Sequence, residues 1–362
     1  MLAWRMQPEG RGSLLSKCAV LRKPLEDLAI LNLEVPPLEH GQVLVEIAYA
    51  GICRSQIMEV DGLRGPDKYL PHLLGHEASG IVLETGSGVS KVKQGEKVIL
   101  SWIRGDGLNA PGPKYKFKNE IINSGQIATF GTVVIVSENC VFKVSKDTDL
   151  VMASLFGCAI PTGAGMALKE LPNNLTESSV IVFGLGAIGM SALFALLSKK
   201  PRLVIVVDRD EAKLKFATSL GSVKTINSTT ENVESQILNF NNGDLCDFAI
   251  DATGSTEGIM EAFSSVRKFG GLCVFASHPK SGQMLKLDPF DLISGRNIRG
   301  SWGGAMNLDS DLSQLLEMFL NNTALSEMFT SSIYELDDVN QAISDLRSNS
   351  VLRPILRMSK DS

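Results

Sequence analysis

The first part of the chain alternates short apolar runs with turn residues. Between residues 18 and 142, runs rich in valine and isoleucine are each bounded by glycine, proline or polar side chains. Such runs predict β-strands, and the clearest are 42–49, 80–84, 97–100 and 132–136. The pattern indicates a strand-rich domain whose loops carry the functional groups.

From residue 151 the pattern changes. Residues 151–170 form a long, alanine-rich apolar run, which predicts a helix interrupted or restarted at Pro161. Strand-like runs then alternate with helical segments: the predicted strands are 180–183, 203–208, 248–251, 271–276 and 297–301, and the predicted helices are 190–199, 211–220 and 256–266. Strands that alternate with helices indicate a parallel, doubly wound sheet.

The C-terminal part predicts two helices, 310–320 and 336–346, a short strand at 332–334 and a closing strand at 352–358 that returns to the first domain. A chain of 362 residues accommodates two domains. We therefore predict an α/β protein, in which a Rossmann doubly wound parallel sheet over 160–302 is flanked by a β-rich domain built from 1–159 and 303–362.

Composition and charge exclude several classes of protein. A hydrophobic content of 44% and a charged content of 21% are typical of a globular chain. The net charge of −5 and the lack of a Lys/Arg run argue against a nucleic-acid partner. The start of the chain lacks the apolar core of a signal peptide, and glycines interrupt the one long apolar run, 180–197, so we expect no membrane span. Six cysteines without paired spacing indicate a reducing, cytoplasmic location.

A glycine-rich turn follows the first strand of the predicted Rossmann sheet. Gly184 permits a tight turn, Gly186 lets a pyrophosphate approach the backbone, and Gly189 allows close packing of helix on strand. Asp208 ends the next strand, where a carboxylate accepts hydrogen bonds from the adenosine ribose and repels a 2′-phosphate. We expect NAD rather than NADP, a preference that the neighbouring Arg209 could soften; the alternative is a structural turn without a ligand.

Three soft or borderline metal ligands stand in separate turn-like stretches close to glycine. Cys53, His76 and Cys158 supply two sulfurs and one imidazole, which suits a zinc site with one open position. Each residue alone is more often a core side chain than a ligand. Glu77 adds a carboxylate beside the histidine. An open metal and a dinucleotide on one chain suggest metal-assisted hydride transfer.

The motifs that carry these residues occur in a fixed order: GICRSQ, GHEASG, GCAIPTGAG, FGLGAIG with VVDRDEAK, and VLRPIL. In this order and over nearly the whole chain they resemble the zinc-dependent alcohol dehydrogenase branch of the medium-chain dehydrogenase/reductase superfamily. The resemblance implies that the β-rich domain is a GroES-like catalytic domain. It also implies that Cys53, His76 and Cys158 are the ligands of a catalytic Zn²⁺, with Glu77 as a carboxylate that can approach the metal.

The resemblance assigns further residues. Ser55 matches the hydroxyl that hydrogen-bonds the substrate alcohol, and Thr162 a threonine beside the nicotinamide. Arg54 and Arg353 match arginines that contact the cofactor pyrophosphate, and Lys213 a lysine near the adenosine ribose. For Lys213 and Arg353 the alternative is a solvated side chain.

The reaction that the resemblance implies is hydride transfer between an alcohol and NAD. Zinc polarises the alcohol oxygen, Ser55 takes the proton, and the carbon delivers hydride to NAD⁺. The substrate is then a small alcohol or carbonyl compound, with a polyol or sugar derivative favoured. The alternatives are a zinc-free NAD(P)H reductase of the same superfamily and a non-catalytic NAD(H)-binding protein. A homodimer or homotetramer is expected, since the apolar runs 272–276 and 298–302 could pair across a two-fold axis.

The chain departs from the family in its cysteines. Many relatives hold a second, structural zinc with four cysteines, but residues 102–122 contain none. We therefore expect one zinc per subunit and a loop that Pro111, Gly112 and Pro113 stiffen. The remaining cysteines are dispersed among apolar residues and are interpreted as core thiols: Cys18, Cys140, Cys246 and Cys273.

Two departures lie beside the predicted ligands. Gln56 stands where relatives often have an aspartate that orients the histidine ligand. A neutral amide adds no negative charge, so we expect a weaker, more electrophilic zinc, which Gln56→Asp would hold more tightly. Met58 stands where some relatives place a relay histidine, so the proton leaves Ser55 by another route.

The predicted substrate pocket also differs. Trp102 falls at a position of a pocket-lining aromatic residue, while Ser124 and Gly125 replace bulkier side chains. These residues suggest a wide, partly polar pocket. A basic stretch with His278, Lys280 and Lys286 could meet a polar or phosphorylated substrate, or could be a solvated loop.

Overall fold

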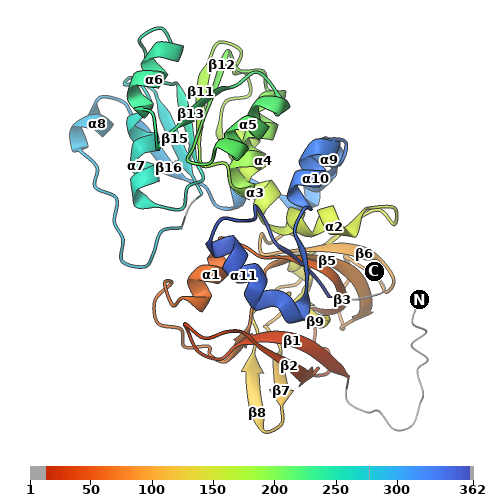
Figure 1. Cartoon of the computed structure of the whole chain (residues 1–362). Coiled ribbons are helices and arrows are strands. Elements are labelled where there is room, and N and C mark those ends of the chain that lie inside the picture. Colours follow the sequence, from red (N-terminus) through yellow and green to blue (C-terminus); the bar gives the residue numbers. More distant parts are fainter. Residues whose placement is uncertain (1–13, 277, 359–362) are drawn as a thin grey trace. The chain divides into compact units, whose positions relative to one another are not determined.

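The computed structural model describes residues 14–276 and 278–358 (Figure 1). These residues form two compact units. Unit 1 joins residues 14–158 to residues 307–358, and unit 2 consists of Ala159–Met306. Each unit has its own sheet and its own core.

Unit 1 contains a small closed barrel. Its strand order is β1-β2-β7-β8-β4, and the strands are β1 (Leu15–Leu21), β2 (Ala29–Glu34), β4 (His72–Leu73), β7 (Lys114–Phe117) and β8 (Glu120–Asn123). Alternating side chains such as Tyr115 and Ile122 fill its interior. The Tyr115 hydroxyl accepts the backbone N–H of Ile135 at 2.8 Å, which ties the barrel to the larger sheet.

The larger sheet of unit 1 has the order β10-β6-β5-β3-β18-β17, and β9 also pairs with β3. Its strands are β3 (Gln42–Gly51), β5 (Glu77–Thr85), β6 (Lys97–Ser101), β9 (Val133–Ser137), β10 (Val141–Lys143), β17 (Ile333–Glu335) and β18 (Ile355–Arg357). The four strands predicted in this half are confirmed. The closing strand β18 pairs antiparallel with β3, so the C-terminal segment returns to the first domain as predicted.

The helices of unit 1 are short and cover this sheet and its ends. They are α1 (Arg54–Val60), η1 (Glu138–Cys140), α2 (Leu150–Ala153), η2 (Ser154–Gly157), α9 (Leu308–Leu320), α10 (Thr323–Phe329), η5 (Leu336–Asp338) and α11 (Val339–Arg347). In α11, Val339, Ala342, Ile343 and Leu346 recur at helical spacing and enter the core, which explains why the sequence pattern located it.

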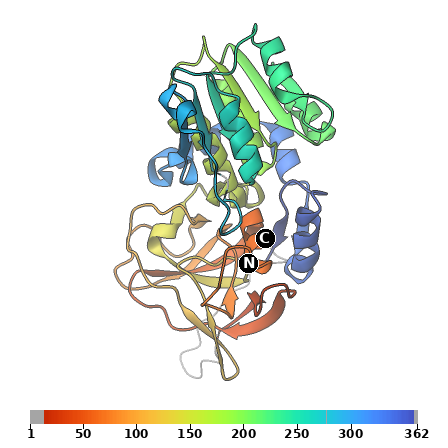
Figure 2. The ribbon, with the colours of Figure 1, turned by 90° about the vertical axis from the view of Figure 1, so that its left-hand side faces the viewer.

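Unit 2 is a six-stranded parallel sheet in the order β13-β12-β11-β14-β15-β16 (Figure 2). Its strands are β11 (Ser179–Phe183), β12 (Leu203–Asp208), β13 (Lys224–Asn227), β14 (Phe248–Asp251), β15 (Leu272–Phe275) and β16 (Asn297–Gly300). Numbered within the unit this is the order 3-2-1-4-5-6 of a dinucleotide-binding fold, whose strand order reverses between β11 and β14. The predicted fold class is confirmed.

Helices cover both faces of this sheet. Figure 1 shows α4 and α5 on one side and α6 and α7 on the other. The helices of the unit are α3 (Ala159–Gly165), the π-helix η3 (Met166–Glu170), α4 (Ala187–Ser198), α5 (Glu211–Leu220), α6 (Val233–Phe240), α7 (Thr256–Ser264), α8 (Pro289–Ile293) and η4 (Gly303–Ala305). Among the described residues no single helix is long and apolar enough to cross a membrane, and Leu150–Gly157 with Ala159–Glu170, bent by 58°, meet that test only as a pair.

The predicted interruption of this run is confirmed, but it lies at Cys158, whose backbone angles are φ −152° and ψ −73°, and not at Pro161 itself. The helix restarts at Ala159. Pro161 lies in the first turn of α3, where a residue needs no intrahelical partner for its N–H. The break turns the chain at Cys158, one of the predicted ligands.

The cysteine-free loop after β6 is held by a buried carboxylate. Glu138, 1% exposed, accepts three backbone N–H groups: Ser90 (2.6 Å) and Lys91 (2.8 Å) on one oxygen and Leu108 (2.7 Å) on the other. Burial opposes ionisation, but these hydrogen bonds lower the pKa of Glu138 below its usual value. The carboxylate thus joins the loop to the turn before β6.

A second carboxylate fixes the tip of the same loop. Asp309, on α9, accepts the backbone N–H of Asp106 at 2.6 Å and forms an ion pair with Lys91 at 2.6 Å. Lys91 also donates to the Asp106 carbonyl at 3.1 Å. The sequence predicted stiffening by Pro111, Gly112 and Pro113; the structure adds a network of charged hydrogen bonds.

We predict that Glu138→Gln lowers the free energy of unfolding by about 2 kcal/mol, because an amide cannot accept at both ends and leaves a backbone N–H facing a donor. The folded pKa of Glu138 is depressed, so its contribution is full above about pH 4.3 and is lost as the pH falls through the folded pKa. Denaturant unfolding at pH 7 and at pH 4 measures both effects. Glu120→Gln, which removes only the half-exposed partner of Arg22, is the control and should change stability by less than about 1 kcal/mol. Equal losses in the two variants would contradict the assignment.

Candidate metal and nucleotide sites

The structure brings the three predicted ligands together in unit 1. One ligand atom from each of Cys53, His76 and Cys158 lies within 4.8 Å of the other two. The Nε2 atom of His76 is 3.2 Å from the Sγ atom of Cys158. Both cysteines are buried, at 8% and 5% exposed. Two sulfurs and one imidazole nitrogen at this spacing fit a zinc ion with an open fourth position.

Each ligand occupies a turn that the local sequence defines. Cys53 is the N-cap of α1, with extended backbone angles. His76 follows Gly75, whose φ of +94° favours glycine and whose missing side chain leaves room for Thr129 and Phe130. Cys158 lies at the break between η2 and α3. None of the three is inside a regular element, so their side chains can converge.

The two sulfurs are coupled through a hydrogen bond. A hydrogen bond from Cys158 lowers the pKa of the Cys53 thiol well below its usual value, and the nearby Arg353 adds to this effect. The same contact, together with burial, raises the pKa of Cys158. Cys53 is thus the sulfur that loses its proton more readily, and a metal held by both sulfurs would require both protons to leave.

A buried ion pair is formed by Glu77, which directly follows His76, and Arg353, which lies near Cys53. Glu77 is fully buried and its carboxylate pairs with the guanidinium of Arg353, which is 4% exposed. Burial raises the pKa of Glu77 although Arg353 and His76 oppose this shift. Burial lowers the pKa of Arg353, but the Glu77 carboxylate and Cys53 raise it above its usual value. Each charge is tolerated in the interior because the other is present.

Two glycines make room for Glu77. A side chain at Gly51 would meet the Glu77 carboxylate, and one at Gly157 would meet the Leu100 carbonyl and the Glu77 Cβ. The hydroxyl of Thr129 donates to the Glu77 carbonyl at 3.1 Å. Gly51 and Gly157 thus bring β3 and η2 against the residue that follows His76.

Ser55 carries a buried hydroxyl next to Cys53 in α1. Among the hydrogen bonds of residues 14–276 and 278–358, none involves its Oγ atom. A buried hydroxyl without a partner is rare and calls for a ligand. This position agrees with the predicted contact to a substrate alcohol, which stays a prediction.

In unit 2 the glycine-rich turn has the geometry expected of a phosphate-binding loop. Gly184 has a φ of +81°, and a side chain at Gly189 would collide with the Gly184 carbonyl. A side chain at Gly186 would meet nothing within 4 Å, so the backbone there is open to a ligand. Gly186 is also the N-cap of α4 and supplies no capping side chain, which leaves the first N–H groups of this helix for an anion.

The carboxylate of Asp208 stabilises this turn through hydrogen bonds to the backbone. One carboxylate oxygen accepts the N–H of Leu185 at 2.5 Å, and the other accepts the N–H groups of Arg209 (2.8 Å) and Asp210 (2.9 Å). The carboxylate is therefore fixed beside the glycines, where a ribose would lie. The Nζ atom of Lys213, on α5, lies 3.8 Å from the Oδ2 atom of Asp210. The Lys213 side chain is only 17% exposed, so it is not a freely solvated lysine.

Two further hydroxyls in unit 2 are buried without a partner among the described residues. One is the predicted Thr162 in α3, and the other is Ser301, directly after β16. The sequence analysis missed Ser301. A small polar residue that immediately follows a strand of a parallel sheet, at the edge where ligands bind, is the signal that could have revealed it.

The predicted arginines are both engaged within unit 1. Arg54 donates to the Leu346 carbonyl at 3.3 Å and to the Asn349 side chain, at the end of α11. Arg353 pairs with Glu77, so the alternative of a solvated side chain is wrong for Arg353. Their contacts to a pyrophosphate stay predictions.

The predicted pocket residues lie at different places. Trp102 donates its backbone N–H to the His76 carbonyl at 3.1 Å, which places it beside a ligand. Ser124 and Gly125 pack their backbone against Gly112 in the cysteine-free loop. Lys280 and Lys286 are exposed, and His278 bonds the adjacent Pro279 carbonyl at 2.8 Å. These contacts are local and do not indicate a substrate for this stretch.

The other cysteines are buried and free: Cys18, Cys140, Cys246 and Cys273. Burial raises the pKa of each thiol, to about 11 for Cys140 and to about 12 for Cys18 and Cys246. Thiols in this state are poor nucleophiles and poor ligands, which supports their interpretation as core residues.

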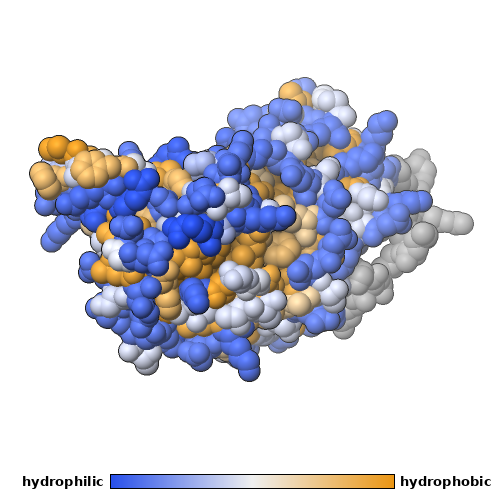
Figure 3. Space-filling view, turned by 90° about the horizontal axis from the view of Figure 1, so that it is seen from above, coloured by the Kyte–Doolittle hydropathy of each residue, from blue (hydrophilic) through white to orange (hydrophobic). Residues whose placement is uncertain are grey.

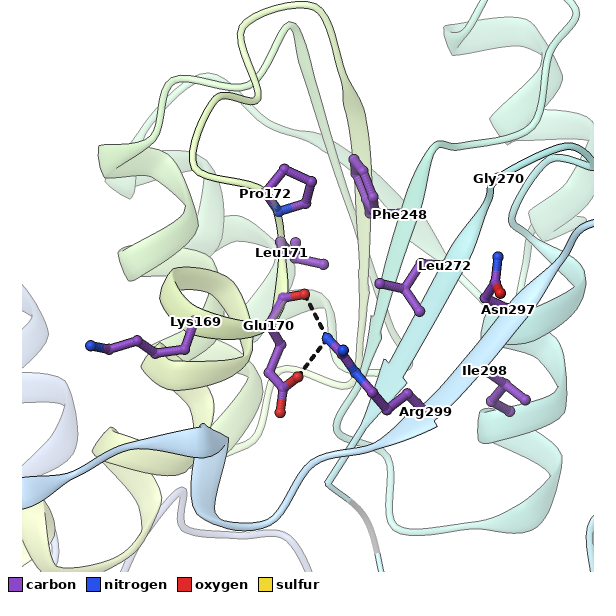
Figure 4. Close-up of a pocket in the computed structure, with 10 residues that line it drawn as sticks. All are labelled: Lys169, Glu170, Leu171, Pro172, Phe248, Gly270, Leu272, Asn297, Ile298 and Arg299. Carbon is purple, nitrogen blue, oxygen red and sulfur yellow. Dashed lines mark hydrogen bonds and ion pairs between the residues drawn. The ribbon is translucent and has the colours of Figure 1, made fainter.

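A surface pocket of about 650 Å³ lies elsewhere in unit 2, at the amino ends of β14, β15 and β16 (Figure 4). Arg299 crosses it and donates to the carbonyl (2.8 Å) and carboxylate (2.5 Å) of Glu170. Ligands of such sheets bind at the carboxyl ends of the strands. The pocket is therefore distinct from the nucleotide site.

Comparison with known proteins gives two family matches. The model of the alcohol dehydrogenase GroES-like domain matches residues 39–146, and that of the zinc-binding dehydrogenase domain matches residues 187–321. Together they span more than half of the chain. The first lies in unit 1 and the second runs from α4 of unit 2 into α9 of unit 1.

Individual relatives cover the chain from end to end. An S-(hydroxymethyl)glutathione dehydrogenase of Komagataella pastoris is 25% identical over 98% of this chain and all of its own length. Among solved structures, a benzyl alcohol dehydrogenase from Acinetobacter calcoaceticus has a TM-score of 0.85 and 26% identity, with 96% of this chain and 100% of that chain covered. A zinc-binding-domain alcohol dehydrogenase from Burkholderia ambifaria reaches a TM-score of 0.86 at 26% identity and the same coverage.

Proposed function

Since the chain belongs to the zinc-type medium-chain dehydrogenase/reductase superfamily and is an oxidoreductase, we propose that it is a zinc-dependent, NAD-linked alcohol dehydrogenase. The observation that carries this proposal is the convergence of Cys53, His76 and Cys158 within 4.8 Å. The buried, unpartnered hydroxyl of Ser55, two residues after Cys53 in the chain, supports it. A metal-free reductase has no use for two buried cysteines and a histidine at this spacing.

The residues of unit 1 would hold zinc and manage the substrate proton. When bound, zinc supplies a Lewis acid for the alcohol oxygen and NAD⁺ supplies the hydride acceptor. Ser55 Oγ accepts a hydrogen bond from the substrate hydroxyl. As it takes up that proton it releases its own hydroxyl proton outward, so the serine stays neutral. Glu77 and Arg353 keep the ligand segments in register and exclude water from beneath them.

The residues of unit 2 would bind the dinucleotide. The backbone at Gly186 and the N-terminus of α4 receive the pyrophosphate, and Asp208 receives the adenosine ribose. The unpartnered hydroxyls of Thr162 and Ser301 are available to the nicotinamide end. Held by these residues, NAD⁺ would supply the hydride acceptor, and the products would be a carbonyl compound and NADH.

The substrate is proposed only as an alcohol or the corresponding carbonyl compound. The relatives named above act on S-(hydroxymethyl)glutathione and on benzyl alcohol, which share a hydroxymethyl group and little else. A polyol or sugar derivative stays a prediction from the sequence alone, since the structure brings only Trp102 of the predicted pocket residues beside a ligand. The free state of all six cysteines supports a reducing compartment such as the cytoplasm.

We predict that Cys53→Ala and His76→Ala each abolish both bound zinc and alcohol-dependent NADH formation, because two remaining ligands cannot hold the ion. Metal analysis of the purified protein and NADH absorbance over an alcohol panel measure the two effects. Cys246→Ala, which removes a buried thiol from the core of unit 2, is the matched control and should keep its zinc. Full activity of a zinc-free preparation would instead favour the zinc-free reductase, and bound NAD(H) without turnover on any alcohol would favour a non-catalytic binder.

We predict that Asp208→Ser lowers the preference for NAD over NADP by at least tenfold, because the carboxylate that repels a 2′-phosphate is lost. The ratio of kcat/KM for the two cofactors is the measurement. Asp210→Ser is the control, since Asp210 caps α5 two residues further along and should not alter cofactor choice. An unchanged ratio in Asp208→Ser would remove Asp208 from the ribose site.

We also propose that the chain forms a homodimer through the free edge of the unit 2 sheet. The sequence predicts that 272–276 and 298–302 could both form this contact, but β15 lies between β14 and β16, so the prediction for 272–276 is wrong. Of the two strands, only β16 lies at an edge of the sheet; the other edge strand is β13. Apolar side chains on α8 accompany β16, with Phe290 61% and Ile293 81% exposed. Figure 3 shows an apolar group at the left end of the molecule, the side on which Figure 1 shows α8.

We predict that Ile298→Pro converts the dimer to a monomer. Asn297 and Ser301 donate their N–H groups to β15, so by the two-residue period of a strand the N–H of Ile298 points away from the sheet. Proline there removes an outward donor and leaves the pairing with β15 intact. Light scattering over a concentration series measures the mass, with Ile298→Val as the control. A monomeric wild-type protein, or a dimeric proline variant, would contradict this interface.

A further inference from the structure

The amide of Gln56 is held at both ends by groups of the candidate metal site. Gln56 is the third residue of α1 and is 1% exposed. Its Oε1 atom accepts the backbone N–H of Cys53 at 2.6 Å, and its Nε2 atom lies 2.6 Å from Nδ1 of His76. A backbone N–H can only donate, so the amide oxygen must face Cys53 and the NH₂ group must face His76. Donor chemistry alone fixes this orientation.

This orientation selects one tautomer of the imidazole. Facing an NH₂ donor, Nδ1 of His76 must carry the lone pair, which places the ring proton on Nε2. Nε2 lies 3.2 Å from Cys158 Sγ and is the nitrogen that points toward the two cysteines. The metal-free arrangement therefore has a proton at the position where a metal would bind.

Binding of zinc through Nε2 requires the opposite tautomer. The lone pair must be on Nε2 and the proton on Nδ1, which then needs an acceptor. With Gln56 as it stands, the Nδ1–H group and the amide NH₂ face each other. If the amide turns over, its NH₂ group meets the Cys53 N–H instead. One pair of opposed donors remains in either case, and the burial of Gln56 and Cys53 leaves little room for water to relieve it.

We propose that Gln56 is a positioning residue that favours the metal-free tautomer of His76 and makes the zinc of this site exchangeable. The inference rests on the proposed zinc site but not on the proposed reaction. A carboxylate in the same place would accept from Cys53 and from His76 together, and would hold the imidazole in the ligating tautomer. The glutamine therefore weakens the hold on the metal through hydrogen bonding as well as through the absence of a negative charge.

The first test is the zinc affinity of Gln56→Glu, which keeps the length of the side chain. Competition between the full-length protein and a chromogenic zinc chelator should give an affinity at least tenfold higher than that of the wild type, with slower release of zinc to excess chelator. Gln42→Glu is the matched control. Gln42 is also 1% exposed and also uses both ends of its amide, accepting from Glu39 N–H at 2.9 Å and donating to the Pro111 carbonyl at 3.0 Å. It contacts none of the ligands, so its zinc affinity should not rise.

The second test separates the tautomer from the added charge. The chain has four histidines, so long-range ¹H–¹⁵N correlation spectra of the metal-free protein are simple, and His76→Asn assigns the signal. The wild type should show His76 protonated on Nε2, and Gln56→Glu should show it protonated on Nδ1. This readout does not depend on turnover, and the wild-type spectrum alone decides the central point if the variant fails to fold.

The outcomes are distinct. An Nδ1-protonated His76 in the metal-free wild type overturns the inference, and so does an unchanged zinc affinity in a folded Gln56→Glu. A rise in affinity in Gln42→Glu equal to that in Gln56→Glu would show a general charge effect and would also overturn it. If the tautomer and affinity change as expected while no alcohol is oxidised, the inference holds and the proposed function fails.

Discussion

The buried ion pair between Glu77 and Arg353 is the interaction on which the geometry of the candidate metal site depends. Glu77 directly follows His76, and its side chain fills the space that Gly51 and Gly157 leave, each within two residues of a cysteine ligand. Arg353 brings in the C-terminal segment, which reaches the site because β18 pairs with β3. Because neither charge is stable alone in the interior, the pair fixes three ligand segments that are far apart in the sequence.

Because Glu77 and Arg353 neutralise each other, they would add no net charge to the buried site when zinc is bound. Two thiolates, from Cys53 and Cys158, balance the two positive charges of Zn²⁺, and Glu77 with Arg353 is neutral as a pair. A centre without net charge avoids most of the desolvation cost that an isolated ion would meet. The hydrogen bond between the two cysteines lowers the pKa of Cys53 and raises that of Cys158, so two adjacent thiolates without a cation are disfavoured.

The sequence predicted those parts of the molecule whose signals are local. β12 and α5 were located residue for residue, because Asp210 caps the helix and Gly221 ends it. β13, with the sequence KTIN, and the small barrel were missed, since their strands are defined by pairing with distant segments. The ligands were found through their motifs. The partner of Glu77 was not found, because a sequence does not show that an arginine is buried: the resemblance assigns Arg353 to a pyrophosphate, with a solvated side chain as the alternative, and neither implies the pair with Glu77.

The cysteine-free loop and Gln56 both reduce the part that a metal ion plays in unit 1. In the loop, Glu138 accepts three backbone N–H groups and Asp309 pairs with Lys91, so its shape depends on charges that belong to the chain. At the ligands, a neutral amide replaces an acceptor that would have fixed the histidine for a metal. The apolar core of unit 1 includes none of Cys53, His76 and Cys158. We therefore expect the fold of unit 1 to depend on this core and on the pair of Glu77 with Arg353 rather than on zinc.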